Sequence, residues 1–188
     1  ASSRKYSRPI TIVDSTLVKA KTFDANNGCS ATVLQTYVRV GPDLADFNSN
    51  LPLVIINTFG QQVPHDQKIS VSAHVIDLAR GRSTLASPPD FAGRGDLNIR
   101  GHTSLRYPKH SYTLKTVEDQ EDPQKVSLLD LPKESDWVLY GPYPDKTLMR
   151  DVLAYELSNA IGQWAPRTKF VEMFVNETGG KIGPRDYV

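Results

Sequence analysis

The sequence predicts an α+β, β-rich fold, in which an antiparallel sheet packs against one principal helix at about residues 146–161. Two observations lead to this prediction. The thirteen prolines and twelve glycines are scattered along the chain and divide it into short segments, which is typical of strands joined by turns. In contrast, a single segment repeats its apolar residues with a helical period.

The expected strands are short runs that are either apolar throughout or alternate between apolar and polar residues. The continuous apolar run at 53–56 predicts a strand that is buried on both faces. The first two runs are expected to form a hairpin or neighbouring strands around a turn at Asn26-Asn27-Gly28, and residues 80–95 are expected to form a loop. The expected strands cover residues 10–21, 31–40, 53–56, 70–77, 97–99, 111–116 and 169–176.

The helix is predicted from a stripe that includes Leu148, Val152 and Tyr155. Asp145 is expected to cap its N-terminus, because a carboxylate there can accept backbone N–H bonds. Gly162 is expected to end the helix, whose apolar sides predict that it is mostly buried. Along the chain, residues 1–45 are expected to form one unit and residues 50–188 a second.

Composition excludes several classes of protein. The chain has 188 residues, of which 39% are hydrophobic and 23% charged, which is unlike a disordered, collagen-like or coiled-coil sequence. The net charge of +1 provides no overall field for nucleic acid, and no apolar run is long enough for a membrane span. The single cysteine, Cys29, has no partner for a disulfide within the chain.

The most informative stretch is 94–115, which is locally basic within a nearly neutral chain. It contains one acid, Asp96, and a set of cationic or titratable bases that includes two histidines. Such a stretch suggests an anion site, for which phosphate is the usual ligand. The alternative is a solvated β-ribbon that pairs with the acidic stretch at 118–136. The bases are Arg94, Arg100, His102, Arg106, Lys109, His110 and Lys115.

Several blocks in this region carry a family resemblance. Arg100-Gly101-His102-Thr103-Ser104 and the following Tyr107–Lys115 resemble the signature of the CotH family, which comprises kinases similar to spore coat protein H. The resemblance continues through blocks at 128–139, 145–150, 153–158 and 165–172, and covers about 97–176. Thr103 departs from the serine common in the family, and the turn at 176–180 is longer than the family's usual one.

The resemblance implies an atypical kinase fold, of which this chain supplies an N-lobe-like part that binds ATP with Mg²⁺. The whole family domain would phosphorylate serine or threonine of a protein, here an unidentified one. Lys109 or Lys115 is the expected phosphate-binding lysine, Arg100 a second cation and Glu156 the acid that orients the lysine. The alternative is that Glu156 lies on an exposed helix edge and that Lys115 pairs with an acid near 118–122. The metal ligands and the catalytic base are expected beyond residue 188, so the fragment is expected to be inactive alone.

A weaker resemblance covers about residues 5–38, which look like the last strands of a chitobiase/β-hexosaminidase C-terminal-type β-sandwich. The two resemblances together imply a secreted or cell-surface bacterial protein whose partners include ATP, without nucleic acid or a membrane span. The alternative function is a non-catalytic extracellular β-module for adhesion, carbohydrate binding, or coat or scaffold assembly. A carbohydrate-binding module would depend on exposed aromatic residues such as Tyr140, Tyr143 or Trp164.

Overall fold

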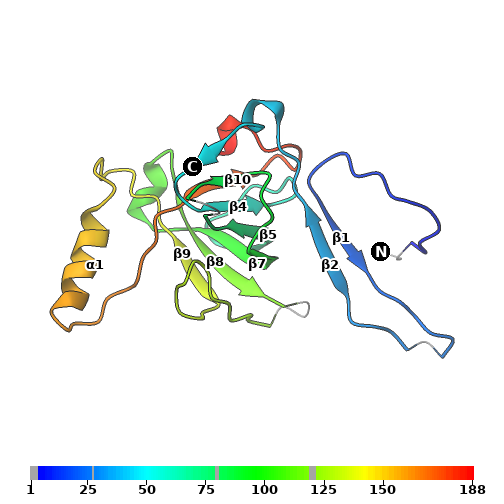
Figure 1. The fold of residues 1–188 in the computed structure, drawn as a ribbon. Helices are drawn as coiled ribbons and strands as arrows, with labels where there is room; N and C mark the ends of the chain where they lie inside the picture. Colours follow the sequence, from blue (N-terminus) through cyan, green and yellow to red (C-terminus); the bar gives the residue numbers. More distant parts are fainter. Residues whose placement is uncertain (1–3, 27, 79–80, 119–121) are drawn as a thin grey trace.

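The central element of the protein is a six-stranded sheet with the strand order β10-β4-β5-β7-β8-β9 (Figure 1). The structure is a computed structural model that describes residues 4–26, 28–78, 81–118 and 122–188. The strands of this sheet are β4 (Leu53–Asn57), β5 (Ile69–Ile76), β7 (Phe91–Arg100), β8 (Ser111–Val117), β9 (Asp136–Leu139) and β10 (Glu172–Asn176).

Smaller elements surround the sheet. A two-stranded hairpin precedes it, a short two-stranded pair lies beside it, and three single 3-10 turns and one α-helix complete the described part of the chain. These elements are β1 (Thr16–Ala20), β2 (Val33–Tyr37), β3 (Asn48–Ser49), β6 (Ser83–Thr84), η1 (Pro42–Leu44), η2 (Thr103–Arg106), η3 (Pro184–Asp186) and α1 (Arg150–Ala160). No helix in the described ranges is long and apolar enough to cross a membrane.

The sheet confirms the β-rich α+β class, with one difference in strand direction. The pairs from β4 through β9 are antiparallel, as expected, whereas β10 runs parallel to β4. Parallel pairing follows from the path of the chain. After β9 the chain passes through α1 and a long connection and returns at the opposite edge of the sheet, rather than through a hairpin turn.

Strand β4 is buried on both faces, as its apolar run predicts. Val54 and Ile56 belong to a first apolar cluster, which also contains Leu97, Leu114 and Val175. Leu53 and Ile55 belong to a second cluster on the opposite face. The second cluster is completed by Leu44, Ile76, Leu85, Phe174 and Ile182. The two clusters require chain segments on both sides of the sheet.

The prediction of a loop at 80–95 is wrong for residues 91–95, because β7 begins at Phe91. Gly93 and Gly95 led to the expectation of a loop, but both lie within the strand. At Gly95 a Cβ would lie 2.7 Å from Cδ1 of Leu114, a core residue of β8. The glycine therefore gives Leu114 room to pack over the backbone, which is a known role of glycine inside strands.

The helix is shorter and more exposed than its periodicity predicts. It begins at Arg150 instead of Lys146, and none of its residues is buried. Leu153 and Leu157 are 57% and 58% exposed, so the expected burial of the helix is wrong. Leu148 has φ +58°, which interrupts a right-handed helical path just before the helix starts. In Figure 1, α1 lies to the side of β9 and does not cover a face of the sheet.

Gly162 follows the helix as the sequence predicts, whereas the N-cap is Met149 instead of the expected Asp145. Asp145 nevertheless binds the first residue of the helix. Asp145 accepts hydrogen bonds from the backbone N–H of Arg150 at 3.0 Å and from the hydroxyl of Thr147 at 2.7 Å. These bonds, led by that from Arg150, lower the pKa of Asp145 from its ordinary value. Gly162, with φ +82°, lies just after the helix in the conformation expected of a glycine stop.

The first two strands form the expected antiparallel hairpin, with Thr16 opposite Tyr37. The expected turn includes Asn27, which lies outside the described residues. Asp14, which precedes β1, and Arg39, which follows β2, form an ion pair at 3.1 Å. The assignment of residues 1–45 to the end of a β-sandwich module, separate from 50–188, stays a prediction.

Substitution of Phe174 tests the importance of the second cluster. Phe174 has no exposed surface and packs edge-on against the rings of Phe47 and Tyr187. Phe174→Ala is expected to lower the free energy of unfolding by about 3–5 kcal/mol, measured by urea denaturation. Leu157→Ala on α1 is the control and should change this free energy by about 0.5 kcal/mol or less. Equal losses for both variants would contradict the exposed position of α1.

Candidate functional site

The connection between β7 and β8 carries most of the basic residues that the sequence singles out. We call residues 100–110 the basic loop. The strand register pairs Arg100 with Ser111, so Arg100 and Lys109 lie at the same end of the two strands. Both side chains are exposed, and the sequence contains no acid between Asp96 and Glu118. The basic loop therefore presents positive charge that its own residues do not neutralise.

A glycine and a histidine fix the start of the basic loop. Gly101 has φ +95°, and a Cβ at this position would lie 2.1 Å from Oγ of Ser104. The carbonyl oxygen of Gly101 lies 2.8 Å from Nε2 of His65, whose Nδ1 lies 2.6 Å from Oδ1 of Asp66. The hydrogen bond with Asp66, followed by that with Gly101, raises the pKa of His65 above its ordinary value.

Tyrosine rings hold the cations at and beside the basic loop. Lys109 Nζ lies 5.0 Å from the ring centroid of Tyr187, and Arg106 lies 5.2 Å from that of Tyr107. A ring attracts a cation without neutralising it, whereas a carboxylate would. Within the described chain, neither Lys109 nor Arg106 forms an ion pair with an acid, so both retain their charge for an incoming anion.

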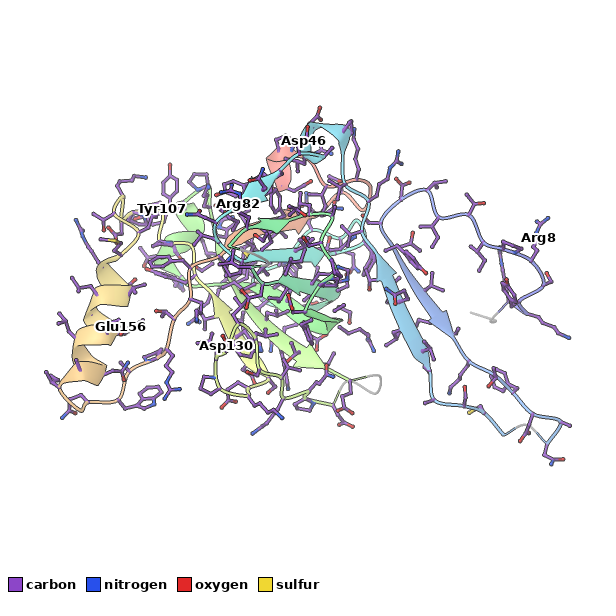
Figure 2. The ribbon with its side chains drawn as sticks, viewed as in Figure 1. Arg8, Asp46, Arg82, Tyr107, Asp130 and Glu156 are labelled. Atoms are coloured by element: carbon purple, nitrogen blue, oxygen red, sulfur yellow. The ribbon has the colours of Figure 1, made fainter. Side chains whose placement is uncertain are left out.

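The same arrangement extends to the segment before α1. The Tyr107 ring packs against that of Tyr143 at 5.6 Å between centroids, and Lys146 Nζ lies 3.9 Å from the centroid of Tyr143. Figure 2 labels Tyr107, which is part of the β7–β8 connection. The tyrosine pair therefore joins the basic loop to residues 143–146, which come from a different part of the sequence.

Glu172, the first residue of β10, anchors the Tyr187 ring that faces Lys109. The Tyr187 hydroxyl donates a hydrogen bond to Oε2 of Glu172, and the Ser49 hydroxyl donates to Oε1 at 3.1 Å. The bond to Glu172, together with burial, raises the pKa of Tyr187 to about 12. The phenol is therefore neutral at physiological pH and can donate to Glu172. This hydrogen bond holds the Tyr187 ring against Lys109.

Lys115 lies away from this loop. It is four residues beyond Ser111 along β8, a distance of about 13 Å at the usual rise of a strand. Its cross-strand neighbours are Asp96 in β7 and Asp136 in β9, although none of the ion pairs within the described residues includes it. Residues 119–121, part of the acidic stretch expected to pair with Lys115, lie outside the described residues.

Glu156 is exposed on α1, where Figure 2 labels it. No hydrogen bond or ion pair in the described part of the chain joins it to Lys109, Lys115 or Arg100. The structure thus brings Arg100 and Lys109 together, but not Glu156 with either lysine. The roles of all four residues stay predictions, and the exposed position of Glu156 agrees with the alternative expected from the sequence.

Metal ligands are not grouped in the described ranges. No cluster of three or more histidine, cysteine, aspartate or glutamate side chains suited to a metal ion occurs there. We therefore derive no chemical step through a metal ion. What the basic loop offers chemically is a set of fixed cations for anionic oxygen atoms.

Comparison with known proteins finds a family match for the part of the chain that contains the basic loop. Residues 97–183 match the family model described as CotH kinase protein. This part of the chain is similar to CotH kinase proteins, and we call residues 97–183 the CotH segment. It starts within β7, includes the basic loop and α1, and ends just before η3. Searches of curated proteins and of solved structures give no match.

Sequence reasoning missed His65 and Tyr107, and it considered Tyr143 only as an exposed ring for carbohydrate binding. His65 lies 36 residues before Gly101 in the sequence, and no local pattern indicates that the two meet. Tyr107 and Tyr143 are likewise far apart in the chain. A weak signal was available for the tyrosines, since each lies a few residues before a lysine: Tyr107 before Lys109, and Tyr143 before Lys146.

Substitution of Gly101 tests the turn that starts the basic loop. Gly101→Ala should lower the free energy of unfolding by about 1–2 kcal/mol, because an L-residue is strained at positive φ, and its Cβ would also meet Ser104. Urea denaturation measures this change. Gly183→Ala is the matched control, because Gly183 has φ −135° and no heavy atom within 4 Å of an added Cβ. An unchanged stability of Gly101→Ala would show that the turn does not require glycine.

Proposed function

We propose that the CotH segment is the nucleotide-binding part of a protein kinase that transfers a phosphoryl group from ATP to serine or threonine of an exported protein. The observation that supports this proposal most directly is the basic loop itself. Exposed Arg100 and Lys109 lie at one end of the β7–β8 pair, without a carboxylate between them in the sequence, inside the segment that matches the family. Phosphoryl transfer depends on cations that hold and neutralise phosphate oxygens.

In this proposal Arg100 and Lys109 contact the phosphates, and Lys115 is the competing candidate for the phosphate-binding lysine. Glu156 would orient that lysine once α1 approaches it, which requires a movement of α1 relative to the sheet. Arg100 suits a phosphate because its guanidinium can donate two parallel hydrogen bonds, whereas Lys109 acts as a point charge. Mg²⁺ neutralises phosphate charge in kinases generally. The proposal for this chain extends to nucleotide binding and not to phosphoryl transfer by the chain alone.

Location in a bacterial cell is part of the same proposal. We propose that the parent protein is secreted or attached to the cell surface, as the two resemblances imply. Residues 1–45 would then be the last strands of a β-sandwich module and the connector that joins it to the kinase part. The direct check is fractionation of the native organism with an antibody against this chain.

Nucleotide binding by the full chain is the first test. Titration with ATP, with and without Mg²⁺, should raise the unfolding temperature. A ligand at 100 times its Kd stabilises the folded state by about 2.7 kcal/mol. Lys109→Ala and Arg100→Ala should each weaken ATP binding by about tenfold or more, because each removes a charge-assisted hydrogen bond. Calorimetry or fluorescence anisotropy measures the affinities.

The control for this experiment is Lys125→Ala, which removes an exposed lysine outside the basic loop. It should leave the ATP affinity unchanged. Loss of binding in Lys115→Ala, with normal binding in Lys109→Ala, would move the site from the loop to the face of the sheet. A well-folded chain that binds ATP no more tightly than the Lys109→Ala variant does would overturn the proposed loop site.

Exposed aromatic residues support a second candidate, the non-catalytic extracellular β-module. Trp164 is 87% exposed and Tyr140 is 57% exposed, and such rings can stack on sugars. Screening the chain against immobilised glycans tests this function. Binding that Trp164→Ala abolishes and ATP does not affect would favour carbohydrate recognition over nucleotide binding.

A further inference from the structure

The two hydrogen bonds of the His65 ring can both form only when the ring is protonated. Both partners of its ring are acceptors: the Asp66 carboxylate at 2.6 Å from Nδ1, and the Gly101 carbonyl at 2.8 Å from Nε2. Neutral imidazole carries one N–H and can donate to only one of these oxygens, whereas imidazolium donates to both. Both hydrogen bonds therefore form only when the ring carries a second proton.

The ring acts on the start of the basic loop, because its partner Gly101 follows Arg100 directly. Two further contacts join the segment around His65 to the end of β7. The backbone N–H of Ile99 donates to the carbonyl of Pro64 at 2.9 Å, and Asn98 Nδ2 donates to the carbonyl of His65 at 3.1 Å. Neither of these contacts titrates, so the backbone stays in place while the ring contact to Gly101 depends on protonation.

We propose that His65, with both ring nitrogens protonated, is a positioning residue that holds the Arg100–Gly101 turn in the geometry that binds phosphate. This inference rests on the proposed nucleotide-binding function of the basic loop. Without the ring contact, the turn at Gly101 loses the hydrogen bond that holds its carbonyl oxygen. The backbone next to Arg100 is then less firmly held, and the position of the Arg100 side chain is less well defined. The protein would then bind anions less tightly at alkaline pH.

The charged groups around His65 determine the pH at which this occurs. Asp66, on the same segment, favours the protonated ring by its hydrogen bond and by its charge. Glu177, which follows β10, accepts a hydrogen bond from the backbone N–H of Val63 at 2.7 Å and adds an acid near the same segment. Arg100 and His102 flank Gly101 in the chain. Partial burial of the His65 ring acts in the opposite direction to Asp66 and lowers the pKa of His65. Lys68, three residues after His65, is exposed.

The direction of the pH effect follows from these contacts. The pKa of His65 is raised in the folded protein above its ordinary value of 6.5. The stabilisation from its two hydrogen bonds is therefore complete below about pH 6.5 and is lost as the pH rises through the raised pKa. Tighter phosphate binding is expected on the acidic side of that transition.

The first measurement is an NMR titration of the full chain, which follows the ring nitrogens of His65 together with the backbone amides of Gly101 and His102. We expect a His65 pKa above 6.5 and the same midpoint for the two amides. A His65 pKa at or below 6.5, or amides that do not titrate with the ring, would overturn the proposal. Asp66→Asn should lower the midpoint and serves if replacement of His65 prevents folding.

The second measurement is ATP affinity at pH 6 and pH 9 for the wild type and for His65→Gln. The ratio of the two affinities cancels the titration of ATP itself. At pH 6 we expect the wild type to bind ATP about three- to tenfold more tightly than His65→Gln, which corresponds to the loss of one hydrogen bond. At pH 9 we expect the two proteins to bind ATP about equally. The ratio for the control variant Lys68→Gln should stay near one at both values.

A ratio for His65→Gln that does not change with pH would overturn the positioning role, because a purely structural effect of the substitution would be the same at both values. Failure of the proposed function is distinguishable from this result. If the wild type binds no ATP at either pH, the nucleotide site is wrong, and the positioning role falls with it even where the NMR midpoint is raised. A raised midpoint would then describe only how the turn at Gly101 is held.

Discussion

Burial of β4 on both faces is the constraint on which the rest of the structure depends. Its side chains alternate between the two apolar clusters, so the chain must supply cover on each side of the sheet. The segments around Leu44, Leu85 and Ile182 provide it on one side. Because apolar burial is the main favourable term in folding, these distant segments are held to the sheet by the same few residues of β4. The pairing of β10 beside β4 then brings Tyr187 and Glu172 to the edge near Lys109.

Electrostatics at the basic loop follow from what lies next to each cation. In a nearly neutral chain every lysine could form an ion pair with an acid, and few cations would then remain to bind an anion. Lys109 and Arg106 instead contact tyrosine rings, which orient the cation and leave its charge and most of its donors available. Lys115 has acids as cross-strand neighbours. This difference is a physical reason to favour Lys109 over Lys115 as the phosphate ligand.

Much of the fold could be predicted from local pattern. The strand at 53–56, the hairpin of β1 and β2, the β8 strand and the alternation of Met173, Phe174 and Val175 between the clusters all follow from periodicity. The exposure of α1 could not be predicted in this way. An apolar stripe shows that one face of a helix favours burial, but it does not show whether another part of the chain lies against that face. The first residues of β7 were missed for a related reason, since Gly95 reflects the approach of Leu114 from another strand and not a local preference for a turn.

The sequence by itself determined the family match of residues 97–183, the β-rich class and the concentration of positive charge between Arg94 and Lys115, because each depends on residues that are close together in the chain. The tertiary structure alone decided which of those charges meet. It placed Arg100 and Lys109 at one end of a strand pair, separated both from Lys115 and Glu156, and brought His65 to Gly101. Strand register and the crossing of distant segments set these distances, and neither is encoded in the spacing of residues along the chain.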